Sequence, residues 1–154
     1  MWPEGWCGSI SHTQKWAIAV IASSSLSVSL GVDIESSQPQ IISEIATTFT
    51  SESERTFLAA CGINYETALL ITFSAKESLF KALYPQVKRF FGFEAARICE
   101  LEQSESRFTL ELTSPLAPGL GLGYRVTGQY SMEAFGVITM IVTSHKPGMM
   151  LLSG

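Results

Sequence analysis

The chain has 154 residues, of which 46% are hydrophobic and 16% are charged, and its net charge is −4 at pH 7. This size and composition predict one globular domain, expected to span residues 1–154, with enough apolar material for a core. They exclude a disordered chain, and the negative charge argues against a general nucleic-acid-binding protein.

The cellular location is predicted from features that the sequence lacks. The first residues have neither the positive charge nor the apolar stretch of a secretory signal. The longest apolar stretch starts at Trp16 and is broken at Ser23, far short of the about 20 residues that cross a bilayer. Three cysteines without CxxC spacing, Cys7, Cys61 and Cys99, argue against a disulfide framework and a zinc site. We therefore expect a cytoplasmic protein with buried free thiols and no membrane span.

The first part of the chain is predicted to hold a hairpin and two helices. Residues 15–22 and 26–34 are β-prone, and the serines between them predict an antiparallel hairpin. The apolar spacing over residues 40–48 predicts a helix. Ser51 and Glu54 then fit a capping box, which predicts the start of a second helix.

A longer helix and a series of strands are predicted in the rest of the chain. Asn64 can cap a helix whose apolar pattern continues to a stop at Pro85. Alternating apolar patterns then predict strands near 93–101, 106–113, 122–130 and 135–143. The predicted fold class is therefore α+β, with an antiparallel sheet packed against helices.

Two carboxylates share one face of the strand that ends the predicted hairpin. Alternate side chains of a strand point the same way, so Asp33 and Glu35 lie together while Val32 and Ile34 point into the core. Gly31 is on the carboxylate face and leaves room there. Two carboxylates on one face repel each other unless a cation lies between them or they diverge into solvent. Mg²⁺ fits, because a few carboxylates bind it together with substrate phosphates and water.

The longest predicted helix adds a third acid and two cations. Glu77 and Lys81 are four residues apart and share one stripe of the helix, and Lys76 lies beside Glu77. If this helix meets the hairpin, Asp33, Glu35 and Glu77 form a three-acid metal site with two lysines beside it for phosphate.

Each of these short patterns also has an ordinary structural explanation. An Asp-x-Glu pair on a strand is most often a solvated edge. A Glu77–Lys81 pair is most often a surface ion pair worth about 0.3–0.5 kcal/mol. Cys7 and His12 also suggest a nucleophile and its base, but no third residue is placed to orient them.

Three sequence blocks together resemble one known family. They are WPEGWCGSISHT at 2–13, GVDIE at 31–35 and FSAKESLFKALYP at 73–85. They are similar to the 4'-phosphopantetheinyl transferases of the two-lobed type, in particular to the branch that includes enterobactin synthase component D. The resemblance extends to about residue 96. It implies a pair of similar α/β lobes with coenzyme A between them, of which this chain has the catalytic C-terminal lobe and part of the inter-lobe region.

The resemblance implies an activity. Such an enzyme uses Mg²⁺ to transfer the phosphopantetheine group of coenzyme A to a serine of an apo acyl, peptidyl or aryl carrier protein. Adenosine 3',5'-bisphosphate is released. Carriers of this kind serve siderophore, peptide, polyketide or fatty-acid synthesis.

The resemblance also implies roles for particular residues. It makes Asp33, Glu35 and Glu77 the magnesium ligands. Glu77 or a metal-bound water is the expected base, Lys81 protonates or stabilises the leaving group, and Asp33 completes the catalytic set. The residues implied to contact coenzyme A are Ser11, His12, Lys76 and Lys81. For His12 we prefer this phosphate contact to a role as the base of Cys7.

The resemblance leaves two questions about the chain as a whole. Two-lobed relatives are longer, so the first lobe is expected to be largely missing, and the chain is either a fragment or assembles with itself to rebuild the cleft. A non-catalytic remnant that binds coenzyme A or a carrier protein is the alternative.

Lys88, Arg89, Phe90 and Phe91 form a basic and aromatic segment after the longest helix. Carrier proteins are acidic, so this segment is a candidate docking surface. The equally weighted alternative is that its aromatic rings are core and its cations are solvated.

Overall fold

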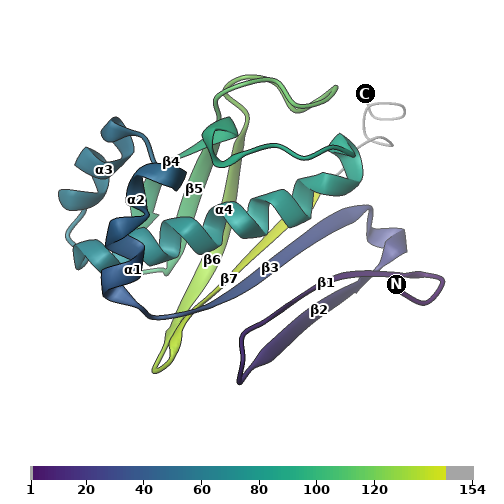
Figure 1. Ribbon diagram of the computed structural model, residues 1–154. Coiled ribbons are helices and arrows are strands. Elements are labelled where there is room, and N and C mark those ends of the chain that lie inside the picture. Colours follow the sequence, from purple (N-terminus) through teal and green to yellow (C-terminus); the bar gives the residue numbers. More distant parts are fainter. Residues whose placement is uncertain (1, 145–154) are drawn as a thin grey trace.

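The structure, a computed structural model, describes residues 2–144, so Met1 and residues 145–154 of the expected domain lie outside the described part (Figure 1). Two antiparallel sheets are present. The smaller one consists of β1 (Trp6–His12) and β2 (Ala17–Ser23). The main sheet has the order β3-β7-β6-β5-β4. Its strands are β3 (Val28–Ser36), β4 (Ala96–Glu102), β5 (Arg107–Leu112), β6 (Arg125–Glu133) and β7 (Gly136–Ser144).

The helices are close to those predicted. They are α1 (Pro39–Glu44), α2 (Ala46–Phe49), α3 (Glu52–Ala59) and α4 (Tyr65–Val87), with a 3₁₀ turn, η2 (Phe93–Ala95), before β4. Ser51 and Glu54 form the predicted capping box, and the Asn64 side chain caps α4. Figure 1 shows α4 crossing one face of the main sheet, with α1, α2 and α3 at one end of it. The α+β class is confirmed. Over residues 2–144, no helix is long and apolar enough to cross a membrane.

Two predicted details of the helices differ from the structure. The helix expected over 40–48 is divided at Ile45 into α1 and α2. Helix α4 does not stop at Pro85 but ends at Val87, where Lys88 turns the chain with a positive φ of 59°. Proline lacks the N–H that would bond the carbonyl four residues earlier and its ring crowds that carbonyl, and the helix continues for only two residues beyond it.

The predicted hairpin between residues 15–22 and 26–34 is wrong. Both segments are strands, but β2 pairs with β1 and β3 pairs with β7. A 3₁₀ turn, η1 (Ser24–Leu26), followed by Ser27 at φ 54°, separates β2 from β3. Segment 6–12 was not predicted as a strand, because its small and polar residues give only a weak β pattern.

The contact between α4 and β3 depends on Gly31. A Cβ at this position would lie 1.9 Å from the carbonyl oxygen of Ser78 on α4, so only glycine lets the two backbones approach this closely. The space beside the carboxylates that Gly31 was predicted to leave is thus occupied by the helix backbone. Val32 and Ile34 are buried on the other face, as predicted. The close approach places Asp33 against α4.

Candidate active site

Strand β1 lies along the edge strand β3 and is held there by side chains. The hydroxyl oxygens of Ser9 and Ser11 accept hydrogen bonds of 3.1 Å from the backbone N–H groups of Val32 and Ile34. The two serines thus satisfy N–H groups at the edge of the main sheet, although β1 belongs to the other sheet. As a result, the Ser11–His12 segment lies beside the carboxylates of β3.

Asp33 is the centre of the contacts between β1, β3 and α4. It is only 4% exposed. Its Oδ2 accepts a 2.8 Å hydrogen bond from Ser74 Oγ, and its Oδ1 accepts a longer one, 3.4 Å, from Ser11 Oγ. Lys81 Nζ lies 3.5 Å from Oδ1. The structure therefore brings together Ser11, Asp33 and Lys81, as predicted from segments far apart in the sequence.

Lys81 also joins three elements through backbone oxygens. Its ammonium group donates to the carbonyl of Val32 on β3 at 2.8 Å and to that of Ile10 on β1 at 3.3 Å. The side chain is 29% exposed, so it remains accessible from solvent. A phosphate that enters here would meet a positive charge already fixed in position.

Glu35 and Glu77 belong to the same electrostatic neighbourhood. Burial raises the pKa of Glu35 to about 9, with further increases from a hydrogen bond to Asp33 and from the charges of Asp33 and Glu77, while Lys81 lowers it. Burial and the Asp33 charge also raise the pKa of Glu77, and Lys81 again opposes the shift. The charge of Asp33 is thus close enough to oppose the ionisation of both glutamates.

The donor chemistry of this acid cluster fits a hard divalent cation. Within residues 2–144, no three His, Cys, Asp or Glu side chains already surround a common point as in a closed metal site. Mg²⁺ does not need such a cage, because one or two carboxylates hold it together with substrate phosphates and water. Burial is the main cause of the two raised pKa values, and a cation would relieve the charge repulsion that adds to it. The assignment of magnesium ligands therefore stays a prediction, and the chemistry of these residues fits it.

An open cleft adjoins the acid cluster. Its volume is about 590 Å³, and Ser11, His12, Asp33 and Glu35 contribute to its lining. Another part of its lining is aromatic, since Trp16 and Phe135 stack with ring centroids 5.5 Å apart. The predicted contacts Ser11 and His12 therefore border a space that is open to a polar ligand.

Lys76 does not join the other residues that were predicted to contact phosphate. It is 5% exposed, and its Nζ lies 2.8 Å from the Phe49 carbonyl oxygen, 3.2 Å from that of Phe93 and 3.0 Å from Glu54 Oε2. Burial lowers the pKa of Lys76, and the Glu54 charge counteracts this. An ammonium group has three protons, so these partners satisfy it. The implied contact with coenzyme A would require this arrangement to open.

Glu77 lines a small apolar pocket. Its volume is about 130 Å³, and it is lined by rings of Phe80, Phe90, Phe91 and Phe93 among others. Phe90 is 77% exposed whereas Phe91 is 9% exposed, and Lys88 and Arg89 are exposed. Both explanations of this segment therefore apply in part: Phe91 belongs to the core, while Phe90 and the two cations face solvent.

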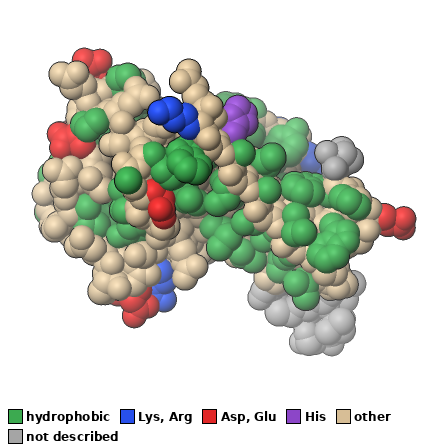
Figure 2. Space-filling view, turned by 90° about the horizontal axis from the view of Figure 1, so that it is seen from below, with side chains coloured by type: hydrophobic (Ala, Val, Ile, Leu, Met, Phe, Trp, Pro, Cys, Tyr) green, Lys and Arg blue, Asp and Glu red, His purple; other side chains and the backbone are tan. Residues whose placement is uncertain are grey.

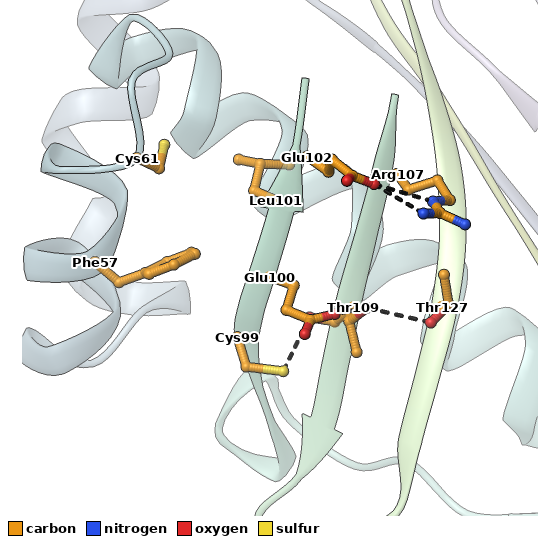
Figure 3. Close-up of a pocket in the computed structure, with 9 residues that line it drawn as sticks. All are labelled: Phe57, Cys61, Cys99, Glu100, Leu101, Glu102, Arg107, Thr109 and Thr127. Atoms are coloured by element: carbon orange, nitrogen blue, oxygen red, sulfur yellow. Dashed lines mark hydrogen bonds and ion pairs between the residues drawn. The ribbon is translucent and has the colours of Figure 1, made fainter. Parts of the chain in front are cut away.

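A further cavity, of about 670 Å³, lies away from these residues (Figure 3). It is formed between α3 and strands β4, β5 and β6, and none of the predicted site residues lines it. Figure 3 shows Arg107 paired with Glu102, at 2.9 Å, and Glu100 accepts a 2.8 Å hydrogen bond from the Thr109 hydroxyl. Cys61 and Cys99 line it as free thiols that are half-buried rather than buried.

Sequence reasoning missed three residues that hold the site together. Ser74 donates a hydrogen bond to Asp33 and is itself hydrogen-bonded to Thr139. Glu54 forms an ion pair with Lys76. The sequence did place Glu54 in the capping box, but this predicted only its contact with Ser51 and not its ion pair with Lys76. Ser74 and Thr139 carry no local signal, because their partners are distant in the sequence.

Comparisons with known proteins point to one family. Residues 29–131 match the sequence model of the 4'-phosphopantetheinyl transferase superfamily. Enterobactin synthase component D of Salmonella typhi is 39% identical over 66% of this chain and 42% of its own length. The 4'-phosphopantetheinyl transferase Svp of Streptomyces mobaraensis is 32% identical over 96% of this chain and 60% of its own length. The chain therefore spans about half the length of the relatives it matches.

Proposed function

Because the chain belongs to the 4'-phosphopantetheinyl transferase superfamily, we propose that it transfers phosphopantetheine from coenzyme A to a serine of an apo carrier protein. The observation that carries this proposal is the meeting of Asp33, Glu35 and Glu77 with Lys81 where β3 contacts α4. Phosphoryl transfer mainly requires positioning and neutralisation of charge. The three acids can hold a cation, and the ammonium group of Lys81 is fixed in position. Together they supply both requirements.

The proposed reaction is a displacement at the β-phosphorus of coenzyme A. The serine oxygen forms a bond to phosphorus, the bond to the bridging oxygen breaks, and adenosine 3',5'-bisphosphate leaves. Mg²⁺, held by Asp33, Glu35 and Glu77, would neutralise the charge of the pyrophosphate. Glu77 is the candidate among this chain's residues to accept the serine proton, and Lys81 would stabilise the leaving phosphate.

The open cleft and the apolar pocket fit different parts of coenzyme A. The open cleft bordered by Ser11 and His12 would hold the phosphates. The apolar pocket lined by Phe80 and Phe90 would hold the dimethyl part of the pantetheine arm. Glu77 lines the apolar pocket, and its charge acts on Asp33 and Glu35, which line the cleft.

The carrier protein would dock on the exposed segment after α4. Lys88 and Arg89 are exposed beside Phe90, which is 77% exposed. Opposite charge steers an acidic carrier to this surface, and the ring adds apolar contact. We propose an acyl, peptidyl or aryl carrier in the cytoplasm, with siderophore assembly as one setting, since several of the similar proteins are named enterobactin synthase component D.

Self-association is proposed to complete the cleft. The β1–β2 hairpin exposes Trp6, Ile10 and Ile21, at 49%, 59% and 57%. Figure 2 shows hydrophobic side chains gathered on this side of the molecule. A second copy that covers this face would place further residues near the cleft. The alternative is a remnant that binds coenzyme A or a carrier without transferring the group.

The test is to mix the chain with an apo carrier protein, coenzyme A and Mg²⁺, and to measure the carrier by intact mass. We expect the gain of one phosphopantetheinyl group, which a chelator prevents. Glu77→Gln and Asp33→Ala should each abolish the gain while the chain stays folded, and Glu44→Gln, at an exposed carboxyl on α1, serves as the control. No gain from a folded chain that binds coenzyme A would favour the remnant.

A further inference from the structure

A line of hydrogen-bonded, buried hydroxyl groups lies on the interior side of Asp33. Ser74 and Ser78 on α4 and Thr139 on β7 are all 0% exposed. Ser74 Oγ lies 2.8 Å from Asp33 Oδ2 and 2.8 Å from Thr139 Oγ1. Ser78 Oγ lies 2.6 Å from Thr139 Oγ1. Thr139 is also the residue directly opposite Asp33 in the pairing of β3 with β7. These groups therefore form one connected network.

The direction of one of these hydrogen bonds follows from Asp33. An ionised carboxylate only accepts, so the single hydroxyl proton of Ser74 points to Oδ2. In its contact with Thr139 Oγ1, Ser74 is then the acceptor. The Thr139 hydroxyl also lies 3.0 Å from the Ser74 carbonyl oxygen, and Ser78 Oγ also lies 3.2 Å from the Thr139 carbonyl oxygen. Only the direction of the Ser74 bond is therefore set by Asp33.

Packing alone does not explain why hydroxyl groups are buried here. Around it, Ile71 and Ala75 of α4 face Val137 and Ile141 of β7, and all four are buried. Burying hydroxyl groups in such surroundings costs free energy unless they are hydrogen-bonded, whereas alanine or valine would pack there without that requirement. Backbone carbonyls also accept from Thr139 and Ser78, whereas the acceptor of the Ser74 hydroxyl is the carboxylate of Asp33.

The two oxygens of Asp33 are held differently. Oδ2 is fixed at 2.8 Å from the interior side, while the contacts of Oδ1 to Ser11 and Lys81 are longer, at 3.4 and 3.5 Å. Glu35, the neighbouring proposed ligand, also hydrogen-bonds to the Asp33 carboxylate. Asp33 also lines the open cleft. We propose that Ser74, supported by Thr139, is a positioning residue that holds Oδ2 and thereby keeps Oδ1 available for a divalent cation. This inference rests on the proposed function.

The test measures metal binding directly, with Mn²⁺ as the probe. The full chain is saturated with coenzyme A, and free Mn²⁺ is followed by electron paramagnetic resonance. Removing a group that orients a metal ligand typically weakens metal binding by about 10-fold or more, which is the effect expected for Ser74→Ala. Thr139→Val, which keeps the side-chain shape, should weaken Mn²⁺ binding by a smaller factor.

The matched control is Thr72→Ala. Thr72 is equally buried on α4, but its hydroxyl donates to the Ala68 carbonyl at 2.8 Å within the helix. This variant should lose stability with its Mn²⁺ affinity unchanged. Unchanged affinity in Ser74→Ala would overturn the inference, and the mass assay would then show whether transfer still occurs. If Ser74→Ala does not fold, unchanged affinity in Thr139→Val overturns it. If the unmodified chain binds no Mn²⁺, the inference and the metal assignment both fail.

Discussion

Lys76 on α4 and Glu54 on α3 form a buried ion pair, with Nζ and Oε2 3.0 Å apart and side-chain exposures of 3% and 4%. Glu54 also accepts hydrogen bonds from the backbone N–H groups of Ser51 and Ile98, at 2.8 and 2.7 Å. Lys76 donates to the carbonyl of Phe93, a residue that lines the apolar pocket beside Glu77. The pair therefore connects the helices to the start of β4 at the edge of the candidate site.

Breaking this pair is expected to destabilise the fold. Lys76→Met leaves Glu54 buried without its cation, which typically costs about 3–5 kcal/mol of unfolding free energy. Urea denaturation measures this loss, with Lys15→Met at an exposed position as the control. The double variant Lys76→Met/Glu54→Gln should recover part of it, because no unpaired charge remains. An unchanged stability together with lost coenzyme A binding would instead support the phosphate contact implied by the resemblance.

The stability of the metal-free chain should depend on pH through Glu35. Its pKa is about 9 in the folded state against 4.5 ordinarily. The folded state thus keeps a proton that the unfolded state releases, so this stabilisation is complete at low pH and is lost as the pH rises from about 5 to about 9. Urea titrations across this range should show the decline, and Glu35→Gln should reduce its slope. Glu77, whose pKa is also raised, accounts for a remaining slope. Identical slopes in both proteins would contradict the raised pKa.

Gly31→Ala is expected to separate α4 from β3. The added Cβ would lie 1.9 Å from the Ser78 carbonyl oxygen and 2.8 Å from the Ala82 nitrogen, both of which are backbone atoms. Overpacking of this kind costs about 1–3 kcal/mol, occasionally more, and the shift should also move Asp33 away from Ser74. Thermal unfolding and Mn²⁺ binding test the two effects. Gly121→Ala is the matched control, because a Cβ there has nothing within 4 Å.

Charge reversal after α4 should affect the carrier protein and spare coenzyme A. In Lys88→Glu/Arg89→Glu, two exposed cations become acidic, so the KM for an acidic carrier should rise several-fold and depend less on salt. Steady-state kinetics with each substrate varied in turn separates the two effects. Arg97→Glu/Arg125→Glu is the control, because it reverses two positive charges on β4 and β6 instead of after α4. An unchanged KM for the carrier in the first variant would remove this docking surface.

The sequence alone determined the local elements and the membership of the acid cluster. The capping box of Ser51 and Glu54, the cap at Asn64 and the alternating strands all depend on residues a few positions apart. Asp33 and Glu35 were placed on one face by the period of a strand, and the blocks around them indicated the family.

Only the tertiary structure decided which elements meet and what each buried polar group contacts. It replaced the predicted hairpin by the β1–β2 and β3–β7 pairs, placed Lys76 against Glu54, and put Ser74 and Thr139 behind Asp33. The physical reason is that a helical or strand period is set by the backbone within a few residues. The partner of a strand edge, a buried charge or a hydroxyl group is instead chosen by packing between segments distant in the sequence, where each buried polar group must be satisfied.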